Sequence, residues 1–321
     1  MKKLIAFLLF LFSAQASALI VPVNFTVKGE YTIAVISDGG RREYRGENLF
    51  TDYGMDWLGG SSGTLRLGLS SSNTAPSFST TLLPSPLGLS PDDGVKTLVV
   101  VSSAVPGPYT VRQDTVYTFA LGAIVGNVCK LGLVGGTNIA ANTLVTEALV
   151  SVSGVPTCVT VLAGEQVIVT YRMTVTYPAD APATVNFDDD GVVTSLGYLA
   201  RPSSLGQSGS TRPQFFSNIA PASIFNIDGY FSAESTNPYN SGQVNAACSS
   251  AWDLKASTPA YIAGSHYKDF VYSGGPGVAR TLRKFCMAVT GTASFIYFFD
   301  SPVTLSADKR MTITFRVSWS R

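Results

Sequence analysis

The chain has 321 residues, of which 45% are hydrophobic and 13% charged, and its 22 Lys and Arg residues nearly balance 21 Asp and Glu residues. This hydrophobic content suffices for a packed core and excludes intrinsic disorder. The near-zero net charge excludes the strong positive field that attracts nucleic acids or anionic membranes. The charged fraction is about half that of an ordinary soluble domain. Such a composition is typical of β-rich extracellular proteins and of proteins that bury surface in an assembly.

The first 18 residues have the pattern of a secretory signal peptide. Residues 1–3 form a positive n-region, residues 4–12 are apolar, and residues 16–18 match an Ala-x-Ala cleavage site. The apolar run is too short to span a bilayer. We therefore expect export through the Sec pathway, with Leu19 as the first residue of a mature chain that passes through the periplasm to the cell surface.

The first segment of the mature chain predicts a β-strand over residues 20–35. Val21, Val23, Phe25 and Val27 alternate with polar residues and Pro22, which is the period of a half-buried strand. Two interpretations stay open. The segment is an ordinary first strand of a sandwich, or it is a strand that completes the sheet of another subunit.

Further strands are predicted along the whole chain, and helical periodicity is scarce. The longest β segment is 159–177, which alternates cleanly after a turn at Gly164-Glu165. The aromatic run 294–299 predicts a central strand buried on both faces. The best helical candidate, 139–150, fits loop and strand equally, and the Ser-, Gly- and Pro-rich stretch 199–213 predicts a loop. The other predicted strands are 64–69, 95–101, 114–125, 286–289 and 310–319.

A Pro- and Ala-rich stretch over residues 179–183 predicts an interdomain linker. It divides the mature chain into an N-terminal domain, 19–178, and a C-terminal domain, 184–321, both of normal size for a β-sandwich. The alternative is a Pro-rich loop inside one domain. We expect an all-β fold with two immunoglobulin-like or jelly-roll β-sandwich domains.

Four cysteines, Cys129, Cys158, Cys248 and Cys286, predict disulfides in an exported protein. Three pairings are open, and the local pairing Cys129–Cys158 with Cys248–Cys286 puts one bridge in each half. A metal site is the weaker interpretation, because the chain has no Cys-x-x-Cys spacing and His266 is its single histidine.

The residues that could perform catalysis are few. His266 is the sole candidate imidazole base, no Gly-x-Ser-x-Gly motif occurs, and no pair of carboxylates converges in the sequence. We therefore expect neither an enzyme nor a cofactor. Residues 188–191, Asp-Asp-Asp-Gly, lack the remaining ligands of an EF-hand. They predict a turn like that at 92–94, with a surface calcium site as the alternative.

One cluster, residues 50–60, suggests recognition. Tyr53 and Trp57 could stack on sugar rings, and Asp52 and Asp56 could accept hydrogen bonds from sugar hydroxyls. The same aromatic residues are also typical of core anchors at a strand crossing, and this interpretation is the more common outcome for residues of their size.

Together, the signal peptide, the Thr-, Ser- and Gly-rich β composition, the alternating first strand, the two Cys pairs and the closing strand resemble a chaperone–usher pilus (fimbrial) subunit. The resemblance extends over the whole chain and is greatest to a two-domain tip adhesin. It implies an immunoglobulin-like C-terminal domain that lacks one strand, filled first by a chaperone and then by the next subunit. The N-terminal domain would carry the receptor site.

The expected function is thus that of an exported fimbrial subunit or adhesin assembled by strand complementation. Its implied partners are other pilus subunits, a periplasmic chaperone, an outer-membrane usher and a host or surface glycan, without nucleic acid. Two alternatives stay open: an outer-membrane β-barrel, because alternating strands also serve there, and a soluble secreted carbohydrate-binding protein or hydrolase.

Overall fold

The structure is a computed structural model that describes most of the chain from residue 19 onward. Within the described residues, β-strands dominate and α1 (Asp52–Gly60) is the one helix. The all-β fold class predicted from the sequence is therefore confirmed. The described ranges are 19–60, 64–102, 107–139, 141, 143–179, 182–189, 192–205, 255–257, 259–274, 280–289, 293–305 and 311–321.

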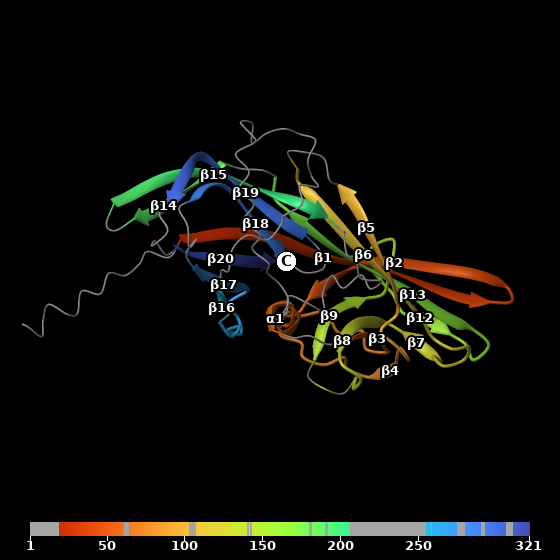
Figure 1. Cartoon of the computed structure of the whole chain (residues 1–321). Helices are drawn as coiled ribbons and strands as arrows, with labels where there is room; N and C mark the ends of the chain where they lie inside the picture. Colours follow the sequence, from red (N-terminus) through yellow and green to blue (C-terminus); the bar gives the residue numbers. More distant parts are fainter. Residues whose placement is uncertain are drawn as a thin grey trace, which may run out of the picture.

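The strands gather in two lobes, which are connected by the long first strand β1 (Leu19–Ser37) (Figure 1). We call the part formed by β2 to β13 with the second half of β1 the N-terminal lobe. The C-terminal lobe consists of β14 to β20 with the first half of β1. Helix α1 and the C-terminal residue lie where the lobes meet.

The N-terminal lobe is built from two groups of strands that share β2. In the first group the second half of β1 pairs with β2 and β13, β13 pairs with β6, and β6 pairs with β5. In the second group β2 pairs with β9, and β8, β3 and β4 follow in that order across the sheet. The bounds are β2 (Gly40–Phe50), β3 (Leu65–Ser70), β4 (Pro86–Leu89), β5 (Val95–Ser102), β6 (Tyr109–Thr118), β8 (Lys130–Gly135), β9 (Leu144–Leu149) and β13 (Gln166–Tyr177).

Two small sheets complete this lobe. One pairs β7 (Gly126–Val128) with β12 (Val159–Val161), and the other is the hairpin of β10 (Ser151–Val152) and β11 (Val155–Pro156). The predicted alternation in β13 is confirmed, because every second side chain from Val167 to Tyr177 is buried. These side chains join residues of β1, β3, β6, β8 and α1 in one continuous hydrophobic core.

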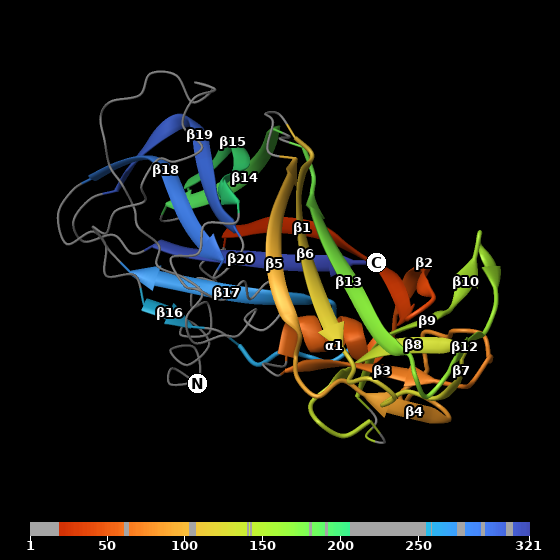
Figure 2. The ribbon, with the colours of Figure 1, turned by 90° about the vertical axis from the view of Figure 1, so that its right-hand side faces the viewer.

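The C-terminal lobe has two layers of strands (Figure 2). One layer has the order β14 (Pro182–Asp189), β15 (Val192–Leu205), β19 (Ala293–Leu305), β18 (Arg280–Val289). The other has β16 (Lys255–Ser257), β17 (Tyr267–Gly274), β20 (Met311–Ser320) and then the first half of β1. The central position of the strand predicted at 294–299 is confirmed, because β19 lies between β15 and β18, and its burial on both faces stays a prediction.

Local backbone geometry explains where the structure differs from the predicted elements. The strand predicted over 114–125 ends at Thr118, and Gly122, with φ of 70°, lies in a turn that follows. The described residues of the 139–150 candidate contain strand β9 and no helix. β15 continues through Pro202 to Leu205 with an irregular register, so part of the predicted 199–213 loop is strand.

The turn interpretation is confirmed for the Asp-rich segment at 92–94, whereas residues 190 and 191 of the segment 188–191 lie outside the described residues. Asp189 pairs with Val192 in the β14–β15 hairpin. In the segment 92–94, Gly94 has φ of 74° and donates its N–H to the Asp92 carboxylate at 3.0 Å. The last residues of the predicted 179–183 linker, from Pro182, already belong to β14.

Candidate functional site

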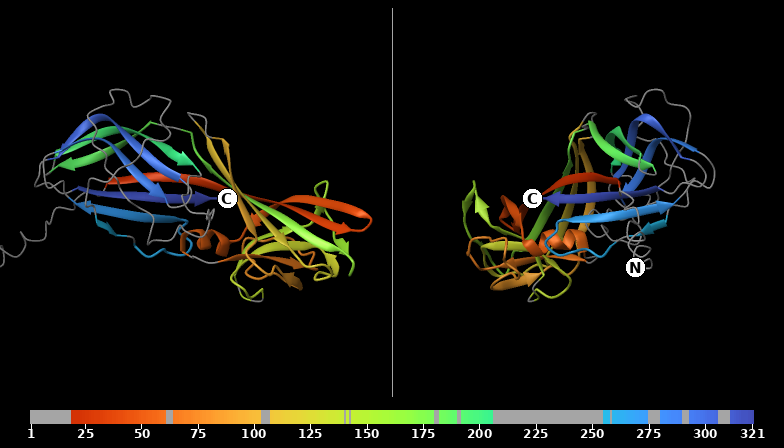
Figure 3. Two further views of the ribbon diagram at one scale, coloured as in Figure 1. Left: turned by 45° about the vertical axis from the view of Figure 1, so that its right-hand side comes forward. Right: turned by 90° about the vertical axis from the view of Figure 1, so that its left-hand side faces the viewer.

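Strand β1 contributes to both lobes, and its first half forms the candidate functional site. From Leu19 to Thr26 it pairs in parallel with β20, and from Thr26 to Ile36 it pairs antiparallel with β13. β2 pairs with β1 over residues 29–37. Figure 3 shows β1 running out of the N-terminal lobe and along β20. The segment Leu19–Thr26, hereafter the crossing segment, therefore makes its ladder hydrogen bonds in the C-terminal lobe.

The crossing segment covers an edge of β20 that no other described strand covers. β20 pairs with β17 on its other side. In the register, Phe25 lies opposite Trp319, and both side chains are buried. Without the crossing segment, the N–H and C=O groups on this side of β20 would lose their partners, and each buried group left in that state costs about 1–3 kcal/mol. The crossing segment thus completes the sheet.

The predicted recognition cluster, residues 50–60, lies beside this edge and forms helix α1. Trp57 is only 3% exposed and packs in the core, whereas Tyr53 is partly buried. Trp57 therefore offers no ring face for a sugar, and its position follows from its large apolar surface. Of the two interpretations of the cluster, the core anchor describes Trp57.

Local sequence explains why this glycine-rich stretch is helical. Thr51 caps the helix, because its Oγ1 accepts the N–H of Gly54 at 2.9 Å. Asp52 follows in the first turn, where a carboxylate is favourable for the helix dipole. At Gly54 a Cβ atom would come within 1.9 Å of the Val145 carbonyl oxygen, so the close packing of α1 on β9 requires glycine.

Both carboxylates of the cluster are engaged by residues from the end of the chain. Asp56 Oδ1 accepts the hydroxyl of Tyr261 and the N–H of Gly264, both at 2.7 Å. Asp52 accepts a hydrogen bond from Arg321 at 2.9 Å, although both side chains keep solvent exposure. Asp52 and Asp56 with these partners form a docking point between the lobes, and Trp57 belongs to the hydrophobic core.

Trp319 connects this docking point to the crossing segment. Its ring stacks on Phe25 with centroids 6.2 Å apart and on Tyr261 with centroids 5.7 Å apart. Its Nε1 donates to the carbonyl of Met55 in α1 at 2.8 Å. At Gly59 a Cβ atom would collide with both Trp319 and Tyr261, so these rings lie directly on the helix backbone.

Burial shifts the pKa values of two groups at this junction. The pKa of Tyr261 rises to about 12, first because of burial and then because its hydroxyl donates to Asp56. Tyr261 thus stays protonated and remains a donor at physiological pH. Burial lowers the pKa of Lys268, whose Nζ donates to the Gly59 carbonyl at the C-terminal end of α1 at 3.1 Å. A cation is favourable at that end of a helix.

The sequence contained a signal for the helix but none for its partners. Thr51 followed by Asp52 is an N-cap with an acidic first turn, which indicates a helix start. Tyr261, Lys268 and Trp319 lie more than 200 positions away from the residues that they contact. Such long-range contacts leave no periodic pattern in a single sequence, so they were missed.

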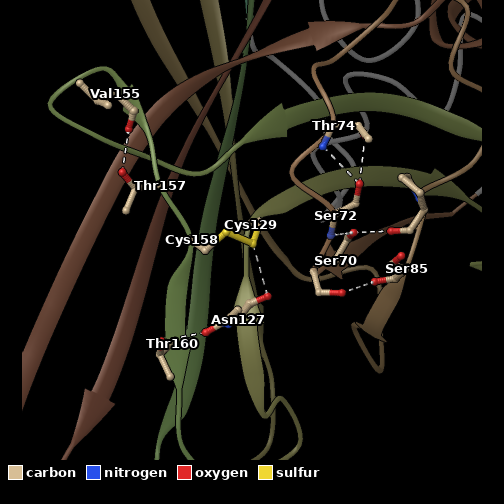
Figure 4. The surroundings of a disulfide bond; sticks show 12 residues. Ser70, Ser72, Thr74, Ser85, Asn127, Cys129, Val155, Thr157, Cys158 and Thr160 are labelled. Carbon is tan, nitrogen blue, oxygen red and sulfur yellow. Dashed lines mark hydrogen bonds between the residues drawn. A yellow bond between two sulfur atoms is a disulfide. The ribbon is translucent and has the colours of Figure 1, made fainter.

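The cysteine prediction is confirmed for one bridge. Cys129 and Cys158 form a disulfide in the N-terminal lobe (Figure 4). Beside it, Thr160 on β12 donates to the Asn127 side chain on β7 at 2.8 Å. Cys286 lies on β18, and Cys248 is outside the described residues, so the second bridge stays a prediction.

The single histidine lies among the described residues. His266 lies in the turn before β17 with φ of 51°, and its backbone carbonyl accepts the N–H of Trp319 at 3.0 Å. Three or more metal-ligating side chains do not gather anywhere in the described part of the chain. No helix there has the length and apolarity needed to span a membrane.

We compared the chain with family models, curated proteins and solved structures, and none of them matches it.

Proposed function

We propose that the chain is an exported, non-enzymatic surface subunit that takes part in attachment and assembles by strand complementation, in the manner of a fimbrial adhesin. The observation that carries the proposal is the crossing segment, which completes the sheet of a lobe that follows it in sequence by more than 150 residues. The edge of β20 that accepts a strand from so far away in the same chain, hereafter the groove, would accept the equivalent strand of another copy.

The two layers of the C-terminal lobe support an immunoglobulin-like sandwich that is incomplete without its donor strand. In the state described here the chain fills its own groove. In the assembled state the crossing segment of one subunit would fill the groove of the next, while residues from Val27 onward stay paired with β13 and β2. A periplasmic chaperone and an outer-membrane usher are the proposed partners for that exchange.

A truncated chain tests the proposal. A mature chain that begins at Thr26 lacks residues 19–25 of the crossing segment but keeps every residue of the N-terminal lobe ladder. A fluorescent peptide of residues 19–27 should bind this chain in a saturable manner and should raise its melting temperature. Because Phe25 is buried against Trp319, the same peptide with Phe25→Asp is the matched control and should bind at least tenfold more weakly.

The full-length chain, whose groove is occupied, should bind the peptide only slowly. A truncated chain that remains a stable monomer with an unchanged melting temperature and does not bind the peptide would show that the sheet needs no donor, and the assembly proposal would fail.

A further inference from the structure

A polar cleft opens on the N-terminal lobe, away from β20. It has a volume of about 630 Å³ and lies between β1, β2 and β13 on one side and the β10–β11 hairpin on the other. Figure 2 shows the hairpin projecting beside β2. Ser151 fixes its position, because its Oγ donates to the Arg45 carbonyl at 2.9 Å. A pocket of this volume is in the range of about 300–1,000 Å³ that is usual for small-molecule sites.

The cleft combines hydrogen-bond donors and acceptors with no net charge. Glu30, Glu47, Arg45 and Arg172 line it, together with the hydroxyl-bearing Thr32 and Ser151. Arg45 is paired with Glu43 at 3.2 Å and Arg172 donates to Thr32 at 3.2 Å. Arg172 is positioned by its contact with Thr32, whereas Arg45 is 75% exposed, and both guanidinium groups keep further N–H groups for a ligand.

The two carboxylates are the unusual feature of this cleft. Glu30 and Glu47 are exposed and directly opposite each other in the β1–β2 register. Neither forms an ion pair with any described residue. Like charges at facing positions of adjacent strands destabilise a sheet. Arg172 faces Glu30 across the β1–β13 pairing without forming an ion pair with it, so both carboxylates stay able to accept hydrogen bonds from a ligand.

The cleft is open at the turn of the β10–β11 hairpin, and its lining has no exposed aromatic residue. A Cβ atom added at Gly154 would meet nothing within 4 Å. Tyr31 lines the cleft but is 1% exposed, and its hydroxyl donates to the Leu149 carbonyl at 2.6 Å. A ligand would therefore be recognised through polar groups, not through stacking on a ring.

We propose that this cleft binds a neutral, hydroxyl-rich ligand of the saccharide class. Vicinal hydroxyls can donate to Glu30 and Glu47 and accept from Arg45 and Arg172, while the balanced charges give no preference to an ionic ligand. The inference rests on the proposed attachment function, and it places the ligand of that function in this cleft and not at helix α1. The crossing segment takes no part in it.

The test uses the full mature chain on an array of immobilised neutral oligosaccharides, sialylated oligosaccharides and sulfated glycosaminoglycans. The chain should bind neutral members, and Glu30→Gln or Glu47→Gln should weaken that binding about tenfold or more, because each removes a charged acceptor. Asp38→Asn, at an exposed carboxylate in the β1–β2 turn, is the matched control and should bind like the unchanged chain. Melting temperatures separate binding from folding, since relief of the Glu30–Glu47 repulsion should leave both variants at least as stable.

Absence of binding to every saccharide would overturn the ligand class. Equal binding by the two Gln variants and the unchanged chain would overturn the site, and binding confined to anionic members would overturn the neutral assignment. Peptide binding at β20 is measured separately, so failure here with success there would leave strand complementation standing and remove only the saccharide site.

Discussion

At the residue scale, the junction between the lobes depends on buried aromatic and polar side chains with specific partners. Trp319 contacts the crossing segment through Phe25 and α1 through the Met55 carbonyl. Asp56 uses one oxygen for two donors from the 261–264 turn. These contacts give α1, the helix that the alternating pattern did not predict, a structural role between the lobes.

Trp57 provides a test of how α1 packs in the core. Trp57→Ala should lower the free energy of unfolding by about 3–5 kcal/mol, because the substitution leaves a large cavity in the core. The partly buried Tyr53 keeps its ring in Tyr53→Phe, so this control should stay within about 0.5 kcal/mol of the unchanged chain. Urea unfolding of both variants measures the difference. A Trp57→Ala chain with unchanged stability would contradict the burial of this ring.

At the scale of elements, alternation predicted strands well and pairing partners poorly. The buried face of β13 could be predicted from its apolar alternation, and the central position of β19 from its aromatic run. Both patterns arise because the burial of a strand in a sheet determines which of its own residues are apolar. The parallel partnership of β1 with β20 could not be predicted, since residues that face each other across a ladder are almost 300 positions apart. For the same reason the partners of α1 had no signal.

A buried ion pair between β8 and β9 shows how elements in this lobe are fixed. Lys130 and Glu147 are 1% and 0% exposed, and their charged atoms are 2.7 Å apart. Glu147 also accepts the N–H of Ser77 at 2.6 Å, which holds the 71–82 loop over the sheet. Lys130 donates to Thr74 of the same loop at 3.2 Å. The pair therefore joins two strands and a loop.

Replacing one member of the Lys130–Glu147 ion pair should lower the free energy of unfolding more than replacing both members. Glu147→Gln leaves the Lys130 charge buried without its counter-ion and should reduce the free energy of unfolding by about 3–5 kcal/mol. Adding Lys130→Met to that change removes the unpaired buried charge and should recover part of the lost free energy of unfolding. Thermal or urea denaturation of the two chains decides this. If the double variant is less stable than Glu147→Gln, charge burial is not the cause.

At the scale of the whole molecule, two sets of contacts between described residues are prominent in joining the lobes, besides the chain itself and the packing of Ala183 in β14 on the core. One is the crossing segment on β20, and the other is the contact of α1 with the 261–268 and 319–321 segments. If the crossing segment leaves the groove, Trp319 loses its stacking partner Phe25 but keeps its hydrogen bond to α1. Exchange between copies would therefore open one connection while the second preserves the arrangement of the lobes.

The most direct measurement of this account is disulfide cross-linking between the crossing segment and β20. Asn24 and Ser318 are register partners, and adjacent strands are about 4.8 Å apart, within the Cα separation of about 4.4–6.8 Å that a disulfide tolerates. We expect Asn24→Cys with Ser318→Cys to form a bridge on mild oxidation, within one chain for the isolated protein and between chains in assemblies, as seen by non-reducing electrophoresis and mass mapping. Asn24→Cys with Thr312→Cys, displaced by six residues or about 20 Å along β20, should form none. Failure of the first pair to cross-link, or equal cross-linking by both pairs, would contradict the pairing of β1 with β20 and with it the proposed assembly.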